Sequence, residues 1–402
     1  MKRILFVDDE PKVLAGLRRM LRSLRRQWDM EFVESGPEAL RRLADRPFDV
    51  VVTDMRMPVM DGSQLLHEVT RRHPATVRII LSGQCDRRAV LKAVGPTHQF
   101  LTKPCDSQTL KSAVARACAL RDQLPDDRLK QMVTCVQSIP SQSAAHGQLL
   151  AELESPAASI QRVGEIISRD VGMTAKIIQL VNSGFFGTPQ RVSDPAHAAN
   201  LLGLDTIRAL VLSTDALSPF GSSHSENRCL EALNDHSLAV ATAARGIARA
   251  ETDDPTLIAD AYLAGLLHDI GTLVLANQSH QNDPDLSAAA DHRQADVQRP
   301  VDQRFSTTRD DVGAYLMELW GVPEPIVKAI AFRSCPGCSS DRTFSPLAAV
   351  HVAGALLEEE PADPAGAGAR IDMDYLERIG CAGRIDAWRG ICRSNQLEGV
   401  SA

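Results

Sequence analysis

Three observations predict an α/β fold with a doubly wound, parallel (βα)5 sheet at the start of the chain and an all-α fold after it. Five short apolar runs in the first 120 residues alternate with amphipathic helical patterns. Beyond them, strand-like alternation disappears and Ala/Leu/Ile-rich helical patterns follow. Residues 1–122 carry 22 Lys and Arg against 15 Asp and Glu, whereas the remaining residues carry 22 against 36. These opposite charge balances indicate two separate domains.

The predicted elements of the first domain alternate in order along the chain. Strand-like runs lie at 3–7, 30–33, 49–53, 77–81 and 99–101, and helical patterns begin at Pro11 and recur near 37–45, 62–72, 86–94 and 106–119. Such alternation is typical of a sheet with helices on both faces. We expect this domain at 1–122, a helical domain at 128–330, and a C-terminal helical extension with a flexible linker at 331–402.

Composition narrows the classes of function. The 402 residues are 44% apolar and 24% charged, as in a globular protein, but only 4% are aromatic. The net charge of -7 and the scarcity of aromatic side chains argue against nucleic-acid binding. The first apolar run is too short for a signal peptide, and His268 and Asp269 interrupt the other strongly apolar stretch. We therefore expect a cytoplasmic protein without membrane contact, in which the nine cysteines are reduced thiols.

Polar side chains follow four of the five predicted strands. Asp8 and Asp9 end the first strand, Asp54 the third and Ser82 the fourth, and Lys103 and Pro104 follow the fifth. The carboxyl ends of parallel strands meet at one edge of a sheet, where ligands bind. Carboxylates gathered there favour Mg²⁺, and a lysine with a hydroxyl suits a phosphoryl group. The pattern predicts an aspartate that accepts a phosphoryl group, although each strand-end Asp taken singly also suits a helix N-cap.

With these motifs, residues 1–120 resemble a two-component response-regulator receiver domain, which has a flavodoxin-like fold. The matching segments are 7–11, 54–58, 60–62, 81–83 and 100–104. The resemblance implies that Asp54 is the phosphoacceptor and that Mg²⁺ is held by Asp8, Asp9, Asp54 and the backbone carbonyl of Arg56. It also implies that Lys103 contacts the phosphoryl group, that Ser82 and Phe100 are switch residues, and that the bond before Pro104 is cis. The implied partner is a sensor histidine kinase.

The helical region carries a second group of side chains that could bind a metal ion. His268 and Asp269 end a strongly apolar helix predicted near 256–270, and His236 lies on the helix before it. Imidazole and carboxylate together suit Mn, Fe or Zn, but buried His and Asp side chains also serve as hydrogen-bonded core residues. Earlier in the region, Asp170 is placed to cap a helix predicted over 171–182.

Residues 128–330 resemble the HDOD domain, a degenerate relative of the HD-superfamily phosphohydrolases. The resemblance rests on motifs at 170–176, 180–183, 202–204, 236–237, 265–271 and 319–323. It implies that His236, His268 and Asp269 are the remains of an HD metal site.

Four positions depart from the pattern of active HD relatives. Arg309 stands where relatives often carry a His, Arg333 and Ser334 replace a common His-His pair, and Gly354 occupies the nearest slot for a final Asp. Protonated arginines near the site would repel a cation. We therefore expect no cofactor and no catalytic activity in this half; the alternative is a single metal ion held weakly by His236, His268 and Asp269.

The motif Cys335-Pro336-Gly337-Cys338 has two interpretations. Together with Cys381 and Cys392 it would supply four zinc ligands, although the spacing differs from the usual paired CxxC pattern. A turn with incidental thiols is the alternative.

Together these features predict a response regulator of a two-component phosphorelay. Phosphorylation of Asp54 would change the contacts between the receiver and a non-catalytic HDOD output domain, which binds a downstream protein in a monomer or a homodimer. The opposite charges of the two halves suggest that the receiver docks on its own helical domain, and the basic run at 18–26 is either a docking or a solvated face. The alternative is a metal-dependent phosphohydrolase acting on nucleotides or cyclic dinucleotides.

Overall fold

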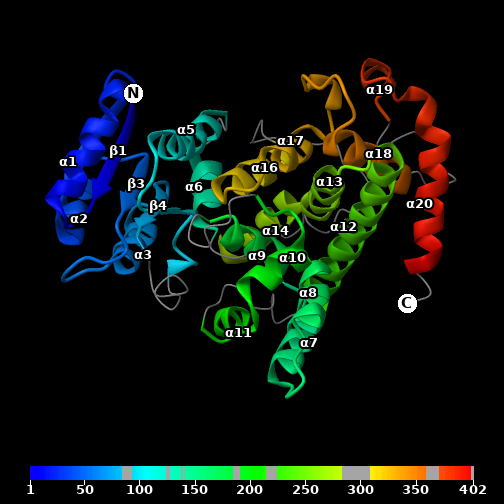
Figure 1. Cartoon of the computed structure of the whole chain (residues 1–402), viewed down its shortest axis with the longest axis horizontal. Helices are drawn as coiled ribbons and strands as arrows, with labels where there is room; N and C mark the ends of the chain where they lie inside the picture. The colour runs from blue at the N-terminus through cyan, green and yellow to red at the C-terminus, as the bar shows by residue number, and fades with distance from the viewer. Residues whose placement is uncertain are drawn as a thin grey trace.

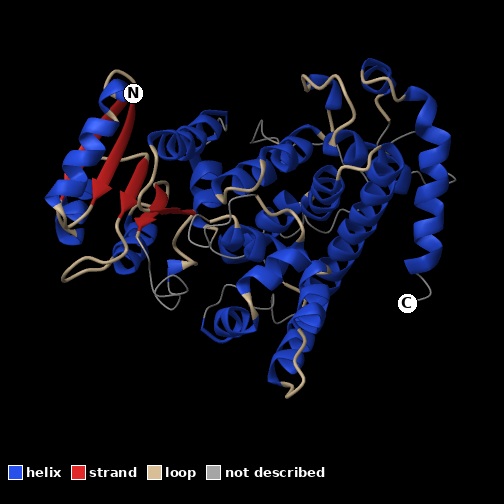
Figure 2. Cartoon of the chain, in the orientation of Figure 1, coloured by secondary structure: helices blue, strands red, loops and turns tan. Residues whose placement is uncertain are grey.

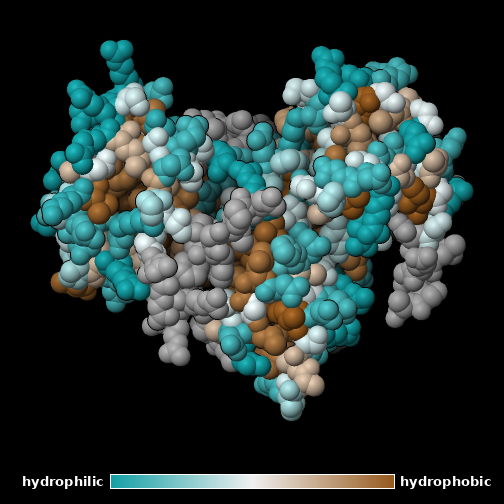
Figure 3. All heavy atoms as spheres, in the orientation of Figure 1, coloured by the Kyte–Doolittle hydropathy of each residue, from teal (hydrophilic) through white to brown (hydrophobic). Residues whose placement is uncertain are grey.

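The structure, a computed structural model, describes residues 1–83, 93–123, 127–136, 139, 141–183, 191–213, 224–282, 308–358 and 371–399. A parallel sheet with flanking helices forms the N-terminal part, and helices form the rest (Figure 1, Figure 2). Both parts of the predicted fold class are confirmed. Hydrophilic side chains cover much of the face in Figure 3, whereas the buried apolar side chains of both parts form one continuous core.

The sheet contains five parallel strands in the order β2-β1-β3-β4-β5. They are β1 (Lys2–Val7), β2 (Trp28–Val33), β3 (Val50–Thr53), β4 (Val77–Ser82) and β5 (Gln99–Thr102), each within two residues of its predicted position. All residues of β3 and β4 are buried, which explains their short, continuous apolar runs. The strand order reverses beside β1, so the carboxyl ends of β1 and β3 border the crevice where such sheets bind ligands.

Four described helices accompany the sheet: α1 (Pro11–Met20), α2 (Gly36–Asp45), α3 (Gly62–Arg72) and α5 (Ser107–Gln123). The helix predicted near 86–94 lies almost wholly outside the described residues. The arginines within 18–26 are exposed, and α1 lies on the side of the sheet away from the helical domain (Figure 1). This basic run therefore does not mediate docking between the two domains, whereas docking to a separate acidic partner stays a prediction.

The helical domain and its C-terminal extension contain α6 (Asp127–Cys135), α7 (Ser143–Glu154), α8 (Ile160–Ser168), α9 (Val171–Val181), α10 (Pro195–Leu202), α11 (Leu204–Ser213), α12 (His224–Glu251), α13 (Pro255–Leu267), α14 (Ile270–Asn282), α16 (Arg309–Leu319), α17 (Glu324–Phe332), α18 (Pro346–Glu358), α19 (Met373–Arg378) and α20 (Ile385–Gly399). Asp170 caps α9 as predicted, accepting a hydrogen bond from the Met173 amide at 2.8 Å. Every residue of α9 is buried. The predicted linker within 361–368 lies outside the described residues.

The helix predicted near 256–270 is α13, which ends at Leu267, so His268 and Asp269 follow its end as predicted. A second helix, α14, begins directly after them at Ile270, and the two residues therefore lie at a break between two helices. The combined stretch Pro255–Ala276 is long and apolar enough to cross a membrane by composition alone, but 67% of its most apolar window is buried inside the protein. This burial is what a core helix of a folded domain requires.

Two glycines beside this break allow close helix packing. A Cβ on Gly265 would lie 2.7 Å from the Ala241 Cα atom of α12, and one on Gly271 would lie 2.0 Å from the Arg309 carbonyl oxygen of α16. Both distances are shorter than any side chain tolerates. The glycines of this motif therefore serve helix packing, because only a residue without Cβ fits there.

The two domains contact each other through β4, the segment 93–99 and α5 on one side, and α6, α9 and α16 on the other (Figure 1). Arg116 and Glu318 form an ion pair across the boundary, with Nε 4.0 Å from the carboxylate. Several other polar contacts there end on backbone carbonyl oxygens. Attraction between opposite net charges is thus a small part of the described contact.

Cys335 and Cys338 form a disulfide in the short turn Pro336–Cys338, and their Cα atoms are 5.7 Å apart. The expected turn is present, but the expectation of reduced thiols is wrong at this pair. Cys381 and Cys392 are buried, and no group of three or more metal-ligating side chains occurs within the described part of the chain. The structure therefore does not support the four-cysteine zinc interpretation.

Candidate functional sites

The carboxyl ends of β1, β3 and β5 bring Asp8, Asp54 and Lys103 together. The Lys103 ammonium lies 2.5 Å from Asp8 Oδ2 and 2.5 Å from Asp54 Oδ1, so it joins the two carboxylates. The other oxygen of Asp54 accepts a hydrogen bond from the Arg56 amide at 2.5 Å. One cation thus balances two carboxylates at the sheet edge where the sequence predicts the site.

Burial and the two carboxylates act in opposite directions on Lys103. Burial by itself lowers the pKa of the ammonium, but hydrogen bonds to Asp54 and Asp8 outweigh it and raise the pKa above its ordinary value. The side chain of Lys103 is 22% exposed and that of Asp54 is 11% exposed, so both reach an opening at the surface. The Lys103–Pro104 peptide bond is cis, as predicted.

The other residues singled out by the receiver resemblance lie at the same edge of the sheet. Ser82 is buried at the end of β4, and its carbonyl accepts a hydrogen bond from the Lys103 amide at 2.7 Å. Phe100 is buried on β5, and Asp9 is half-buried after β1. Arg56 points its exposed side chain away from the core. The structure therefore brings these residues to the same edge of the sheet.

Two positions between β3 and the start of α3 have unusual backbone requirements. A Cβ on Gly62 would lie 2.2 Å from the Asp54 carbonyl oxygen, so α3 can begin directly behind Asp54 only with glycine there. Val59 has a φ of 69°, a left-handed conformation that β-branched residues rarely adopt, and is 94% exposed. The strain at Val59 was not predictable, because the residue carries no chemistry that draws attention to it.

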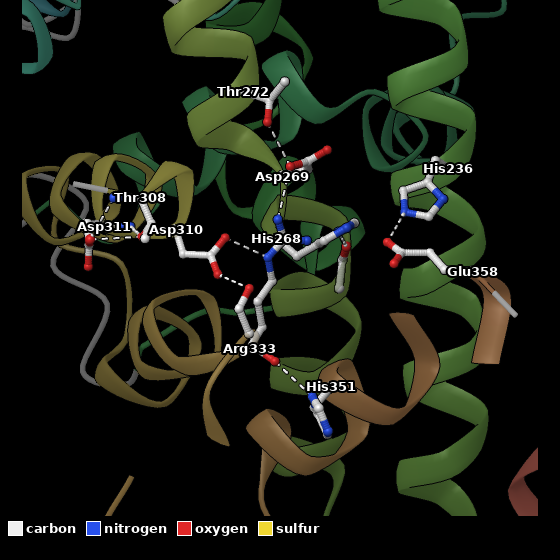
Figure 4. Close-up of polar contacts among 12 residues, drawn as sticks. His236, His268, Asp269, Thr272, Thr308, Asp310, Asp311, Arg333, His351 and Glu358 are labelled. Atoms are coloured by element: carbon white, nitrogen blue, oxygen red, sulfur yellow. Dashed lines mark hydrogen bonds and ion pairs between the residues drawn. The ribbon is translucent and has the colours of Figure 1, made fainter. Parts of the chain in front are cut away.

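A second polar cluster lies at the break between α13 and α14. His236, His268 and Asp269 meet there, as the sequence predicts, but the Arg333 guanidinium lies at its centre (Figure 4). Arg333 Nη2 donates to Asp269 Oδ1 at 3.1 Å, and Nε donates to Asp310 Oδ1 at 2.7 Å. A planar guanidinium held by two carboxylates is a strong, directional arrangement.

Electrostatics keep this cluster ionised. Burial by itself lowers the pKa of Arg333, but Asp310 and Asp269 raise it above its ordinary value. Burial raises the pKa of Asp269, but the positive charge of Arg333 outweighs it and brings the pKa to about 2. Burial and Arg333 together lower the pKa of His268 to about 3, so its imidazole is neutral at pH 7.

His268 presents an unprotonated ring nitrogen to the cluster. Its Nδ1 lies 2.7 Å from the Gly265 carbonyl oxygen, which can only accept, so Nδ1 carries the proton and Nε2 does not. Nε2 is buried and has no hydrogen-bond partner among the residues that the structure describes. The His236 ring lies 5.4 Å from the His268 ring, and His236 Nε2 lies 3.9 Å from Glu358 Oε1. A neutral imidazole with a free lone pair is the form that binds metals.

The donor set nevertheless does not fit a metal ion while Arg333 is present. Its guanidinium uses the oxygens of Asp269 and Asp310 and repels cations. Of the two arginines noted in the sequence, Arg333 supplies the repelling charge that shifts these pKa values, and Arg309 does not.

Sequence reasoning missed two carboxylates of this cluster. Asp310 directly follows Arg309, the position that the HD pattern marked, and Glu358 lies four residues after Gly354 on α18. Residues four apart lie on the same face of a helix, so Gly354 and Glu358 share one face of α18. Gly354 has no side chain there, and the Glu358 side chain reaches the cluster instead. An i+4 search from Gly354 would have found it.

The family comparisons agree with this division of the chain. Residues 4–115 match the family model of the response regulator receiver domain, and residues 139–336 match that of the HDOD domain. The fold and the first pocket thus define a receiver domain, and the helical part is an HDOD domain. The chain belongs to the response regulators in which a receiver domain is fused to an HDOD domain.

Curated relatives match parts of the chain. An uncharacterized protein of Treponema pallidum is 28% identical over 201 residues, which are 49% of this chain and 38% of the relative. The transcriptional regulatory protein GlrR of Escherichia coli K12 is 31% identical over 153 residues, which are 37% and 33%. The response regulator protein PilR of Pseudomonas aeruginosa is 34% identical over 122 residues, which are 30% and 27%. The chain spans about a third of the length of these relatives.

Two solved structures illustrate the structural likeness. The signal receiver domain of an HD domain-containing protein from Pseudomonas fluorescens Pf-5 is 34% identical, covering 29% of this chain and 93% of that one, with a TM-score of 0.28. The MmoQ response regulator from Methylococcus capsulatus is 22% identical, covering 63% and 98%, with a TM-score of 0.45.

Proposed function

We propose that this protein is a cytoplasmic regulator that is controlled by phosphorylation. Asp54 accepts a phosphoryl group from a sensor histidine kinase, and the receiver then controls a non-catalytic HDOD domain that binds a downstream protein. The observation that carries this proposal is the Lys103 ammonium shared by Asp8 and Asp54 at an open sheet edge. The domain limits in this proposal are 1–122, 128–330 and 331–402.

Phosphoryl transfer needs a carboxylate that the phosphodonor can reach. It also needs a cation that can contact the negatively charged oxygens of the phosphoryl group once it is transferred. The Asp54 carboxylate attacks the phosphorus atom of a phosphohistidine, the P–N bond breaks, and an acyl phosphate forms. The Arg56 amide fixes one oxygen of Asp54 during the attack. Lys103 carries a point charge on a flexible stem, so it can turn from the carboxylates to the oxygens of the transferred group.

The same pocket suits a divalent cation. Asp8, Asp9 and Asp54 with the Arg56 carbonyl would hold Mg²⁺, because carboxylate and carbonyl oxygens are its usual protein ligands. Bound there, the ion would neutralise negative charge that develops on the phosphoryl group. Lys103 contacts one oxygen of Asp8, Oδ2, and we expect the ammonium to leave it when a cation binds.

The connection from this pocket to the HDOD domain runs through the segment before β5. Phe100 lies on β5, and the preceding Thr97 and His98 carbonyls accept hydrogen bonds from Gln179 Nε2 of α9, at 3.3 and 3.2 Å. Gln99 Nε2 donates to the Glu318 carbonyl of α16 at 3.2 Å. A shift of β5 around Phe100 would therefore act directly on two HDOD helices.

Two cations strengthen this boundary. Lys176 Nζ on α9 donates to the Val94 carbonyl at 3.2 Å, and the ammonium lies 4.9 Å from the centre of the Trp320 ring. Arg78 of β4 donates to the Thr134 carbonyl of α6 at 2.6 Å. Burial lowers the pKa of Lys176 to about 7 and that of Arg78 to about 10. A buried donor that loses its acceptor destabilises by about 1–3 kcal/mol, so small strand shifts change this interface.

The HDOD domain acts by binding rather than by hydrolysis in this proposal. Arg333 occupies the carboxylates that a hydrolytic metal would need. The phosphohydrolase alternative has no observation in its favour that outweighs this contact.

One experiment tests the phosphoacceptor. The full chain is incubated with Mg²⁺ and a small acyl phosphate, and the mass of the protein is measured. We expect one added phosphoryl group in the wild type and none in Asp54→Ala. The Asp61→Ala variant, whose side chain caps α3 nearby, is the matched control and should stay phosphorylated. Persistent incorporation in Asp54→Ala contradicts the assignment.

A second experiment tests the connection between the domains. Hydrogen–deuterium exchange of α9 and α16 is compared before and after phosphorylation of the full chain. We expect faster exchange in α9 after phosphorylation and no change in Asp54→Ala. Unchanged exchange in a fully phosphorylated sample would contradict transmission through this boundary, while leaving the phosphoacceptor assignment intact.

A further inference from the structure

One reactive group lies outside both pockets and has no part in the proposed function. Cys335 and Cys338 are exposed in the connection between α17 and α18, where they form a disulfide. Cys381 and Cys392 of the C-terminal extension are buried instead, and burial raises the pKa of both thiols, that of Cys392 to about 11. Because the thiolate is the reactive form, the exposed pair and the buried pair differ sharply in expected reactivity.

The turn that carries the pair is held by bonds that do not involve sulfur. The Cys338 amide donates to the Cys335 carbonyl at 3.0 Å. The guanidinium of Arg378 on α19 donates to three further carbonyls of the turn, those of Pro336, Gly337 and Ser339, at 3.0–3.2 Å. These contacts remain when the sulfur–sulfur bond opens. The two sulfurs therefore stay close to each other in the reduced form, which favours closing the bond again.

The bond is poorly suited to a purely structural role. It closes a loop between residues only three apart in sequence. In the chain-entropy description, a disulfide stabilises a fold less as its loop becomes shorter, because it removes less freedom from the unfolded chain. The neighbouring Arg378 contacts already fix the turn. Opening this bond should thus leave the fold intact.

We propose that Cys335 and Cys338 are a reversible dithiol–disulfide site that exchanges with thiol and disulfide compounds of the glutathione class. The proposal rests on the exposure of both residues, their CxxC spacing and the sulfur-independent turn that holds them together. It is independent of phosphorylation at Asp54.

The exchange is balanced with glutathione as the co-reactant. In the oxidising direction, the thiolate of one cysteine attacks a sulfur of glutathione disulfide, forms a mixed disulfide and releases one glutathione thiolate. The second cysteine, as its thiolate, attacks the protein sulfur of that mixed disulfide and releases the second glutathione. Two protein thiols lose two electrons and two protons in total, and one glutathione disulfide becomes two glutathione molecules.

The test is a redox titration of the native full chain. The protein is equilibrated in buffers of graded glutathione to glutathione disulfide ratio, quenched with acid, alkylated and digested. We expect the peptide with Cys335 and Cys338 to change from no alkyl groups to two as the buffers become reducing, while Cys381 and Cys392 stay as thiols throughout. A pair that is alkylated at every ratio, or a disulfide that resists millimolar reducing agent in the folded protein, overturns the proposal.

Variants separate exchange from simple exposure. Cys335→Ser should leave Cys338 as a stable mixed disulfide with glutathione, because the resolving thiol is missing, and Cys338→Ser should do the same at Cys335. The matched control is Cys229→Ser, a partly buried cysteine on α12, which should leave the titration of the pair unchanged. Failure of both single variants to form the mixed disulfide also overturns the proposal. Circular dichroism of each variant checks that the fold is kept.

Discussion

Each half of the protein holds one cation between two carboxylates, and the two arrangements behave differently. In the receiver, Lys103 joins Asp8 and Asp54 through a single ammonium on a flexible stem. In the HDOD domain, Arg333 joins Asp269 and Asp310 through two separate N–H groups of one rigid plane. The lysine ammonium can break its contact with one carboxylate and keep the other. The rigid, planar guanidinium cannot move away from one carboxylate without also disturbing its hydrogen bond to the other.

The surroundings reinforce this difference. Around Arg333, Ser334 Oγ donates to Asp310 at 2.6 Å and Thr272 Oγ1 donates to Asp269 at 2.8 Å. The Arg333 carbonyl also accepts a hydrogen bond from His351 Nδ1 at 2.8 Å. The two clusters thus differ in how the cation is held rather than in exposure, since the side chain of Lys103 is 22% exposed and that of Arg333 is 18% exposed. The lesson is that the residue types alone do not decide whether a cluster of acids binds a cation.

Removing the arginine gives the largest expected effect. Arg333→Ala leaves the carboxylates of Asp269 and Asp310 without a counter-charge and should lower the free energy of unfolding by about 3 kcal/mol. Since His268 also offers an unprotonated ring nitrogen, Mn²⁺ should raise the melting temperature of this variant by more than it raises that of the wild type, in which only the receiver pocket would bind the ion. Chemical denaturation and thermal melts measure both effects.

Arg342→Ala removes an exposed arginine from the same region and is the control. It should change the free energy of unfolding by less than about 0.5 kcal/mol. If Arg333→Ala is equally harmless, Arg333 does not hold the cluster together, and the comparison between the two domains fails.

A pair of glycine variants should separate the two sites. Gly271→Ala places a Cβ against the backbone of α16 and should destabilise the protein by about 2 kcal/mol, with phosphorylation of Asp54 unchanged. Gly62→Ala pushes on the Asp54 carbonyl and should slow phosphorylation of the folded protein. Melting curves and the rate of mass increase with an acyl phosphate give the two readouts. Equal effects of both variants on phosphorylation would contradict independent sites.

Lys176 is a cation that is completely buried at the boundary between the two domains. Its native pKa is about 7, whereas an unfolded lysine has a pKa of about 10.4. Between these values the unfolded chain holds a proton that the native protein has lost, so stability rises with pH, by up to about 1.4 kcal/mol per pH unit. Lys176→Met should remove this slope between pH 7 and 10. The exposed Lys12→Met is the control, and an unchanged slope in Lys176→Met refutes the prediction.

The smallest expected effect concerns the loop beside Asp54. Val59→Gly relieves a left-handed backbone conformation worth about 1–2 kcal/mol, but it also adds freedom to the unfolded chain. We expect a net gain below about 1 kcal/mol in the free energy of unfolding, measured by denaturant titration. A clear loss of stability would show that the exposed valine side chain makes a contribution that its strain does not reveal.

The receiver was more predictable than the HDOD domain for a physical reason. Its predicted site residues follow the carboxyl ends of strands. Parallel strands bring these ends to one edge of the sheet, however the surrounding side chains pack. The HDOD cluster instead depends on how helices far apart in sequence approach each other, and no local pattern shows that Asp310 and Arg333 meet.

Counting bound Mn²⁺ ions on the full chain tests the contrast between the two clusters most directly. The structure leads us to expect one divalent-ion site per chain, lost in Asp9→Asn and kept in His268→Ala. Isothermal titration with Mn²⁺ gives this stoichiometry for the wild type and both variants. A second site that disappears in His268→Ala, or a single site that survives Asp9→Asn, would contradict the account. Either result would mean that the receiver is not the only domain that binds a divalent ion, or that it does not bind one through Asp9.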